Sequence, residues 1–573
     1  MVHICDCFPA RIRRALAELP ETLDETYERT LRGINKANWD IAHRMFQFVS
    51  VASRPLRVKE LAELLAFDFD AGSIPEFYED WRVEDPVDAV LSTCSTLLAV
   101  VNDQGSPVIQ FSHFSVKEFL TSTRLAEATD IISRYHISMT SAHTLVAQAY
   151  FGILLYLDED ITDDSLKHFP LVVYFAEHWI DHALFEDVSR NVEDGMKQLF
   201  DPSKSHLAIC VWIGDLSVPS WERPPRNETP LQLSQTPLHY AASWGLHTVV
   251  EFLVIEYSQD VCCRHSTNNA TPLHLASRNG HVKAACKLIE HGADVTAQDN
   301  DGDTPLHLAL YFGRVEVARM LIERGADPTA QDKYGNTPLH LASREGEVDV
   351  ARMLIEHGAD VTAQDDDGDT PLHLALYFGR VEVACMLIER SADPTAQDKN
   401  GNTPLHLALY WRRVDITRLL IERGADVTAQ DNDENTPLHL ASIWGKEDVA
   451  CMLIGRGADL TAQDKNGNTP LHLALKEGEV DVACTLIERG ADLTAQNNDG
   501  ETPLHLVSAP CAEISPQEHA EFVHMLLEHN ADVNSRSNDR STPFSLASQE
   551  GHTEVVHVLS QHGSDSGAND NVN

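Results

Sequence analysis

The chain has 573 residues, of which 43% are hydrophobic and 23% are charged. This composition is ordinary for a folded protein, and the length is too great for a single core. Acidic side chains outnumber Lys and Arg by 88 to 44, so the net charge is −44. That balance argues against nucleic-acid binding, because a phosphate-binding surface needs clustered cations.

Neither a membrane span nor a secretion signal is evident in the sequence. No apolar run approaches the ~18 residues that a span requires, and residues 1–20 lack a long apolar block after their charged start. An isolated Cys5-x-Cys7 lacks the second ligand pair of a zinc site. Four other cysteines occupy one register of a repeat, where stacked helices ~8–10 Å apart are too distant for disulfides: Cys286, Cys385, Cys451 and Cys484. We expect free thiols and a cytoplasmic protein, with the nucleus as the alternative.

The N-terminal part predicts a helical domain that ends in a strand. Hydrophobic spacing predicts helices over residues 39–53, 58–66 and 87–100, a turn at 103–105 and a strand at 108–111. Three strings accompany these elements: Leu19-Pro20-Glu21-Thr22-Leu23-Asp24-Glu25-Thr26-Tyr27, His113-Phe114-Ser115-Val116-Lys117-Glu118-Phe119-Leu120 and Phe175-Ala176-Glu177-His178-Trp179. In content and order, residues 10–215 resemble the part of large fungal NACHT–ankyrin proteins that follows their nucleotide-binding module. Those proteins are NLR-like (STAND) signalling proteins.

The resemblance implies a domain plan. Residues 1–35 correspond to the end of, or a linker from, a missing NACHT-type module, residues 36–135 to a winged-helix-like domain, and residues 136–228 to a helical connector. The sequence contains no Gly-x-x-x-x-Gly-Lys-Ser/Thr loop to hold phosphates, so nucleotide hydrolysis is not implied. We therefore expect either a shortened relative or a truncated gene product.

Sequence motifs for a deacylase, a zinc protease and DNA binding are also incomplete or absent. A related domain carries the name of a glycosylphosphatidylinositol deacylase, but no Gly-x-Ser-x-Gly elbow occurs here. His178 and His182 have the i, i+4 spacing of metal ligands, although Trp179 stands where a zincin has Glu, and buried helix histidines are the alternative. The segment over residues 87–100, the candidate recognition helix of the winged-helix-like domain, has no Lys or Arg that could contact DNA phosphates. We expect no enzyme activity, cofactor, metal, membrane contact, nucleic acid or small-molecule substrate.

From residue 229 onward one unit repeats. Thr304-Pro305-Leu306-His307-Leu308-Ala309 returns every 33 residues from Thr271 to Thr502, with Val507 in place of alanine in the copy at Thr502, and looser copies begin at Thr236 and Thr542. In residues 299–331, Thr304 and Pro305 predict a first helix that ends at Gly313. A second helix follows over residues 315–324 and ends at Gly325. A single unit cannot bury its apolar face, so the units must stack.

These residues resemble the ankyrin repeat, which implies a solenoid of about ten helix pairs with projecting loops over residues 229–563. Residues 564–573 are expected to be disordered. Ser391 and Arg412 replace helix-ending glycines, at a cost of about 1 kcal/mol each. Phe544 and Ser545 alter the tenth copy, and seven residues are inserted around Pro510–Pro516. Residues 300–333 and 366–399 are nearly identical, so they offer almost the same surface twice.

The positions before the first-helix glycine are the candidate partner-binding site, since in ankyrin proteins they line the concave face. Aromatic pairs dominate the middle repeats, and charged pairs flank them. Trp, Tyr and Arg are the usual hot-spot residues of interfaces. The alternative is that each ring only seals the stack against the next repeat. The predicted partner-binding residues are Trp244, Tyr311, Phe312, Arg344, Tyr377, Phe378, Tyr410, Trp411, Trp444 and Lys476.

The loop tips show a second pattern, since charges alternate from Asn300-Asp301 and Lys333-Tyr334 to Lys465-Asn466. Two readings remain open: a solvated edge, or a charge ladder that selects a partner. Taken together, the sequence favours a mainly α, non-catalytic scaffold or sensor that binds a protein partner in NLR-like signalling. One alternative is the sensor part of a NACHT-type NTPase whose ATPase module is missing, and another is a degenerate product without a partner.

Overall fold

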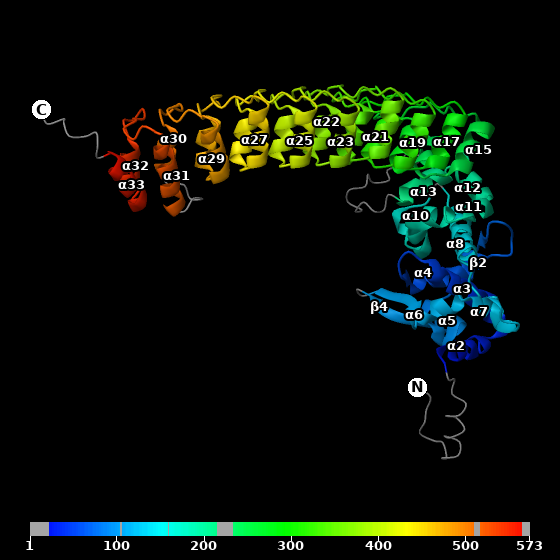
Figure 1. Ribbon diagram of the computed structural model, residues 1–573. Helices are drawn as coiled ribbons and strands as arrows, with labels where there is room; N and C mark the ends of the chain where they lie inside the picture. Colours follow the sequence, from blue (N-terminus) through cyan, green and yellow to red (C-terminus); the bar gives the residue numbers. More distant parts are fainter. Residues whose placement is uncertain (1–21, 104–105, 159, 215–232, 509–515, 564–573) are drawn as a thin grey trace, which may run out of the picture. The chain divides into compact units, whose positions relative to one another are not determined.

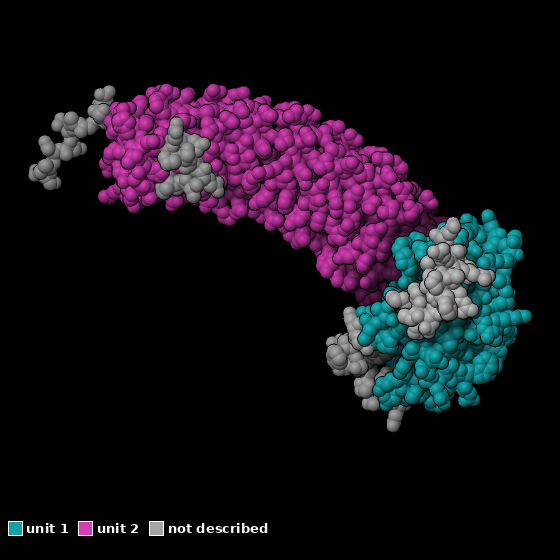
Figure 2. All heavy atoms as spheres, turned by 90° about the horizontal axis from the view of Figure 1, so that it is seen from below, with its two compact units in different colours: residues 1–267, 271–276, 283–293 teal, residues 268–270, 277–282, 294–573 magenta. Residues whose placement is uncertain are grey.

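The structure is a computed structural model that describes residues 22–103, 106–158, 160–214, 233–508 and 516–563. The chain forms two compact units (Figures 1 and 2): residues 1–267, 271–276 and 283–293 in unit 1, and residues 268–270, 277–282 and 294–573 in unit 2. The expectations for Cys5-x-Cys7, for residues 510–515 of the insertion and for the tail at 564–573 fall outside the described residues. Within the described ranges, no helix has both the length and the apolar character to cross a bilayer.

Unit 1 begins with short helices around a three-stranded antiparallel sheet of order β1-β5-β4, in which Leu56 pairs with Ile109 and Val101 with Val108. A smaller sheet pairs β2 with β3. The elements are α2 (Leu23–Arg32), η1 (Lys36–Asn38), α3 (Trp39–Val51), β1 (Leu56–Arg57), α4 (Val58–Ala62), η2 (Glu63–Ala66), β2 (Phe67–Asp68), β3 (Glu76–Phe77), η3 (Glu79–Trp81), α5 (Pro86–Cys94), η4 (Ser95–Leu97), β4 (Leu98–Asp103), β5 (Ser106–Phe111), α6 (Phe114–Leu120), α7 (Thr123–Ala126) and η5 (Ile131–Tyr135).

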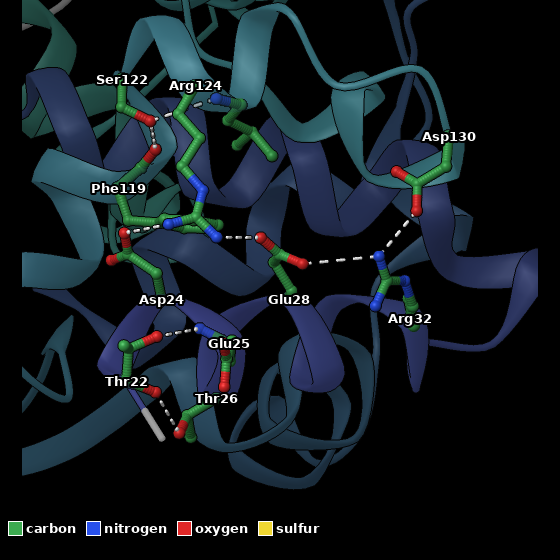
Figure 3. A network of polar contacts seen from close by, with 11 residues as sticks. Thr22, Asp24, Glu25, Thr26, Glu28, Arg32, Phe119, Ser122, Arg124 and Asp130 are labelled. Atoms are coloured by element: carbon green, nitrogen blue, oxygen red, sulfur yellow. Dashed lines mark hydrogen bonds and ion pairs between the residues drawn. The ribbon is translucent and has the colours of Figure 1, made fainter. Parts of the chain in front are cut away.

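Helix α2 is held against this domain by polar contacts. Thr22 caps it by accepting a hydrogen bond from the Glu25 amide. As Figure 3 shows, Arg124 reaches Asp24 and Glu28 at 3.0 and 2.8 Å, and Arg32 reaches Asp130 at 2.7 Å. The Tyr27 hydroxyl lies 2.7 Å from Ser115 Oγ. Two of the three strings singled out in the sequence, the one around Tyr27 and the one around Ser115, therefore meet in space.

Three predicted helix boundaries were wrong. The helix expected over residues 87–100 ends at Cys94, and Leu98–Asp103 forms strand β4. The β-branched pair Val100-Val101 fits a strand, and β5 supplies its hydrogen-bonding partner. The helix expected over residues 58–66 becomes a 3-10 turn after Ala62. Helix α3 stops at Val51, two residues before its predicted end.

A helical connector and the first repeat complete unit 1. The connector contains α8 (Met139–Leu154), α9 (Asp163–Leu166), α10 (Pro170–Ala183), α11 (Val188–Asn191), α12 (Glu193–Leu199) and α13 (His206–Gly214), and the first repeat contains α14 (Pro237–Ser243) and α15 (His247–Tyr257). Buried Trp179 stacks on Tyr150 with ring centroids 5.1 Å apart. The second repeat, α16 (Pro272–Asn279) and α17 (Val282–Glu290), is divided between the two units.

Unit 2 is a stack of helix pairs (Figure 1), and its outline is curved (Figure 2). First helices pack on first helices and second helices on second helices along the stack. The first helices are α18 (Pro305–Tyr311), α20 (Pro338–Glu345), α22 (Pro371–Tyr377), α24 (Pro404–Tyr410), α26 (Pro437–Ile443), α28 (Pro470–Lys476), α30 (Pro503–Ser508) and α32 (Pro543–Gln549). The second helices are α19 (Val315–Glu323), α21 (Val348–Glu356), α23 (Val381–Glu389), α25 (Val414–Glu422), α27 (Glu447–Gly455), α29 (Val480–Glu488), α31 (Pro516–Glu528) and α33 (Thr553–Gly563).

The repeat chemistry follows the sequence closely. Thr304 caps α18 through its hydroxyl with Pro305 at the first helical position. Gly313 and Gly325 both have positive φ, 65° and 86°. Ser391 and Arg412 adopt the same left-handed conformation, with φ of 68° and 55°, which side chains disfavour. The predicted ankyrin-type solenoid is confirmed, and it places one surface position of every repeat in line with the next.

The repeated histidine connects each unit to its successor. His307 Nδ1 accepts a hydrogen bond from the Thr304 amide at 3.2 Å, so the proton sits on Nε2. That Nε2 donates to the backbone carbonyl of Asn336 at 3.1 Å, across the repeat junction. Burial lowers the pKa of His307, which keeps this tautomer neutral. The same arrangement recurs at His340, His373, His406, His439, His472 and His505.

Candidate functional site

The predicted aromatic residues of unit 2 lie at the ends of the first helices, and all of them except Trp444 are exposed. Tyr311 and Tyr377 are 55% and 57% exposed, and Trp411 is 46% exposed. Large side chains of this kind are normally buried, so a row of them at one register is informative. The side chains of Phe312, Phe378 and Tyr410 are exposed as well.

These rings also contact the neighbouring repeat. Tyr377 meets Trp411 edge to face with centroids 5.6 Å apart, and Tyr410 approaches Trp444 at 6.3 Å. The guanidinium of Arg344 lies 4.9 Å above the Tyr311 ring. The two interpretations left open by the sequence are therefore compatible. One part of each ring closes a repeat junction, and the rest remains available to a partner.

Trp244 differs from the other predicted residues. It belongs to unit 1, where its half-buried ring packs against Trp179 at 5.6 Å and Phe200 at 5.8 Å. For this residue the packing interpretation fits, because the connector covers the position that is open in later repeats. Trp444 is also half-buried, beneath Arg412 at 4.3 Å. Lys476 is exposed at the end of α28.

Arginines accompany the aromatic row, and most of them were not singled out from the sequence. Arg314 directly follows Gly313, and its Nε donates to the carbonyl of Arg278, 3.2 Å away. Two repeats later, Arg380 follows Gly379 and donates to the carbonyl of Arg344 at 2.9 Å. The signal that could have found them is their constant position after the first-helix glycine. We call the whole set the arginine–aromatic face: Arg278, Tyr311, Phe312, Arg314, Arg344, Tyr377, Phe378, Arg380, Tyr410, Trp411, Arg412, Arg413 and Trp444.

The face differs in charge from the rest of the chain. The net charge of the sequence is −44, yet arginines dominate this row. Arg344 is paired with Glu345 at 3.1 Å. Among the described residues, the side-chain hydrogen bonds of Arg314 and Arg380 go to backbone carbonyls and neither arginine forms an ion pair, and both residues are exposed. The terminal nitrogens of both guanidinium groups therefore remain as cationic donors, in segments that also carry the exposed rings of Tyr311 and Tyr377.

The loop-tip charges largely satisfy one another. Lys333 Nζ lies 2.6 Å from Asp301 Oδ1, and Lys399 Nζ lies 2.9 Å from Asp367 Oδ1. Lys465 and Asp433 form a longer pair at 3.4 Å. Each lysine amide also bonds the carbonyl of its partner aspartate, which fixes the register of adjacent tips. The alternation seen in the sequence thus forms pairs within the edge, and such exposed pairs contribute little stability.

Two aspartates beneath these tips have pKa values well above the ordinary value of a carboxyl group. Burial, together with nearby Asp299 and Asp332, raises the pKa of Asp303 to about 7. Asp369 occupies the same position two repeats later, and its pKa is also raised to about 7. In the intervening repeat the position is Asn336, whose amide donates to Asp332 at 3.2 Å. An amide suits this site, whereas a second carboxylate repels the first.

The paired histidines of the connector lie in a buried network. His182 Nδ1 is 2.8 Å from His143 Nδ1, and His182 Nε2 is 3.2 Å from the Tyr174 hydroxyl. Burial lowers the pKa of His182 to about 3, so the ring is neutral. The Nε2 atom of His178 lies 3.8 Å from the Oε2 atom of Glu177. In the part of the chain that the structure describes, no three His, Cys, Asp or Glu side chains are placed to hold a metal ion.

Both the repeat region and the N-terminal region match known protein families. Overlapping segments from residue 222 to residue 570 match a family described as ankyrin repeats. Residues 27–131 match a family described as the winged helix domain of GPI inositol-deacylase. One similar curated protein is the azaphilone pigments biosynthesis cluster protein L of Monascus ruber, 28% identical over 294 residues. The alignment covers 49% of this chain and 61% of that protein, so the chain spans about three fifths of its relative's length.

Proposed function

This chain belongs to the ankyrin-repeat family, and from that premise we propose that it is a non-catalytic scaffold or sensor that binds a protein partner through its arginine–aromatic face. The observation that carries the proposal is the row of exposed rings from Tyr311 to Trp411 at two adjacent positions of the repeat. Aromatic and arginine side chains are enriched in the energetic centres of protein interfaces. The absence of phosphate-loop and nucleophile-elbow motifs from the sequence supports binding over catalysis.

The N-terminal part supports a more specific role. The resemblance to NACHT–ankyrin proteins supports a signalling role, in which unit 1 transmits what the repeats bind, and the winged-helix match supplies a domain of the expected kind. A second candidate follows from the same resemblance: the chain is the sensor part of a NACHT-type NTPase whose ATPase module is missing from this sequence. Transcript sequencing of the 5′ region decides between the two. An in-frame phosphate-binding loop would favour the second candidate.

The binding proposal is tested with a purified partner. Candidate partners are first captured with the full chain, then measured for affinity against Tyr377→Ala/Trp411→Ala. We expect this double variant to weaken binding by at least ~2 kcal/mol, about thirtyfold. The matched control is Tyr334→Ala, which removes a ring that is 60% exposed at a loop tip. Equal affinity of the double variant and the unaltered chain, with both folded, would reject the face as the site.

A further inference from the structure

The arginine–aromatic face contains two nearly equivalent stations. The first has Tyr311, Phe312 and Arg314, with Arg278 from the preceding repeat above Phe312 at 4.8 Å. The second has Tyr377, Phe378 and Arg380, which stand 66 residues further along the chain. In both, the Nε of the arginine after the glycine bonds the backbone of the preceding repeat. The two stations therefore hold their cations through the same bond, and both arginines are exposed.

The repeat between the stations is electrically different. Arg344 is paired with Glu345, and Glu347 takes the position that Arg314 and Arg380 occupy in the stations. The cationic character is therefore concentrated at two points rather than spread evenly. Because the Nε of Arg314 is already bonded, its terminal nitrogens are the donors that remain for a partner. Such a fixed guanidinium is suited to bidentate binding of a carboxylate.

We propose that the two stations bind an extended acidic polypeptide segment with two carboxylate clusters. This inference rests on the proposed function and adds the class of the partner. Stacked helices lie ~8–10 Å apart, so two repeats span roughly 16–20 Å. An extended chain advances ~3.3 Å per residue, which places the two carboxylate clusters about five or six residues apart. Apolar or aromatic side chains beside each cluster contact the Tyr-Phe pairs.

The sign of the charge is what selects this partner. A chain of net charge −44 repels acidic segments everywhere except where arginines gather. Single-stranded RNA also stacks on rings and pairs with arginine. A phosphate backbone needs a continuous basic groove, whereas Arg314 and Arg380 are separated by a repeat that carries Glu345 and Glu347. We therefore assign the face to a polypeptide, and RNA becomes an outcome of the test.

The experiment measures fluorescence anisotropy of labelled peptides with the full chain at low and raised ionic strength. The probe is a synthetic peptide about twelve residues long with two Glu-Glu pairs six positions apart and apolar residues between them. One comparison peptide carries Gln for Glu, and another has a single Glu-Glu pair. A uridine oligonucleotide of similar length tests RNA. We expect the probe to bind at least about tenfold more tightly than either comparison peptide and the RNA, with salt weakening it.

The variant Arg314→Glu/Arg380→Glu should lose at least about tenfold in affinity for the probe. Arg352→Glu/Arg418→Glu makes the same charge change on second helices and should stay within about twofold of the unaltered chain. Arg314→Gln/Arg380→Gln provides a milder change if the reversal unfolds the array. Equal binding of Glu and Gln peptides, or tighter RNA binding, overturns the inference. If the natural partner is lost from Tyr377→Ala/Trp411→Ala while acidic peptides fail to bind, the proposed function stands and only the partner class is wrong.

Discussion

His340 donates from Nε2 to the backbone carbonyl of Asp369, 3.0 Å away in the next repeat. Its other ring nitrogen bonds the threonine that opens its own repeat, Thr337, so both polar atoms of a fully buried side chain are satisfied. One side chain thereby joins the cap of one unit to the loop of its successor. The tenth repeat carries Ser545 at this position, and within the described residues its side chain and amide bond Thr542.

The substitution His340→Ser should therefore uncouple two repeats. It preserves the local cap but leaves the Asp369 carbonyl without its donor and opens a cavity. We expect a loss of about 2–4 kcal/mol in the free energy of unfolding. Urea denaturation followed by circular dichroism measures it. A loss below about 0.5 kcal/mol would show that the link between repeats is dispensable.

The same histidines predict acid sensitivity. The pKa values of His340 and His472 are lowered by burial to about 4, from an ordinary 6.5. Between these values the unfolded chain binds more protons, so stability should fall as the pH drops from 6.5 towards 4. Thermal melts across this range check the prediction. A melting temperature that rises steadily with acidification would contradict it.

Asp303 and Asp369 act in the opposite direction. Their folded-state pKa of about 7 lies above the ordinary 3.8, so their ionisation destabilises the array as the pH rises through 7. We expect Asp303→Asn and Asp369→Asn each to stabilise the protein by about 1 kcal/mol at pH 8, allowing for partial exposure. The gain should shrink as the pH falls to 5. Asn336, already an amide, is the natural control, and Asn336→Asp should produce the mirror effect.

Ser391 offers a test of backbone strain within nearly identical sequence. Its φ of 68° matches the 86° of Gly325 two repeats earlier. The substitution Ser391→Gly should stabilise the array by about 1 kcal/mol, and Gly325→Ser should destabilise it by a similar amount. No atom would meet a new side chain at Gly325, so the backbone conformation is the only cost there. Equal denaturation midpoints for all three proteins would contradict this account.

Trp244 and Trp411 should separate packing from binding. Trp244→Ala removes contacts with Trp179 and Phe200, so unit 1 should lose about 2–4 kcal/mol. Trp411→Ala, at an exposed position, should cost under about 1 kcal/mol while reducing partner affinity. Differential scanning calorimetry and partner titration measure the two effects. Similar stability losses in both variants would mean that Trp411 is also chiefly structural.

The repeats could be predicted closely because their signals are local. The interval of 33 residues predicts the repeating unit, Thr304 predicts the start of its first helix, and Gly313 predicts the end of that helix. Strand β4 was missed because an apolar run can be helix or strand, and only its pairing with β5 decides. Trp244 shared the register of Trp411, but the connector that covers it lies far away in the sequence.

The arginines of the site show a further limit of sequence reasoning. Arg314 and Arg380 were absent from the predicted residues because single cations are common on acidic solenoids. Their meaning appears only when their bonds to Arg278 and Arg344 hold them beside the rings. The same holds for the loop tips, where the alternation was visible but the pairing of Lys333 with Asp301 was not.

The most direct test of the central claim is amide hydrogen exchange of the full chain with and without its purified partner. We expect the bound partner to slow amide hydrogen exchange in residues 305–316, 371–382 and 404–414. These segments carry the two stations and the aromatic pair of the next repeat. Second helices and the loop tips should change little. Protection confined to unit 1, or to the loop tips around Tyr334, would contradict the assignment of the arginine–aromatic face as the binding site.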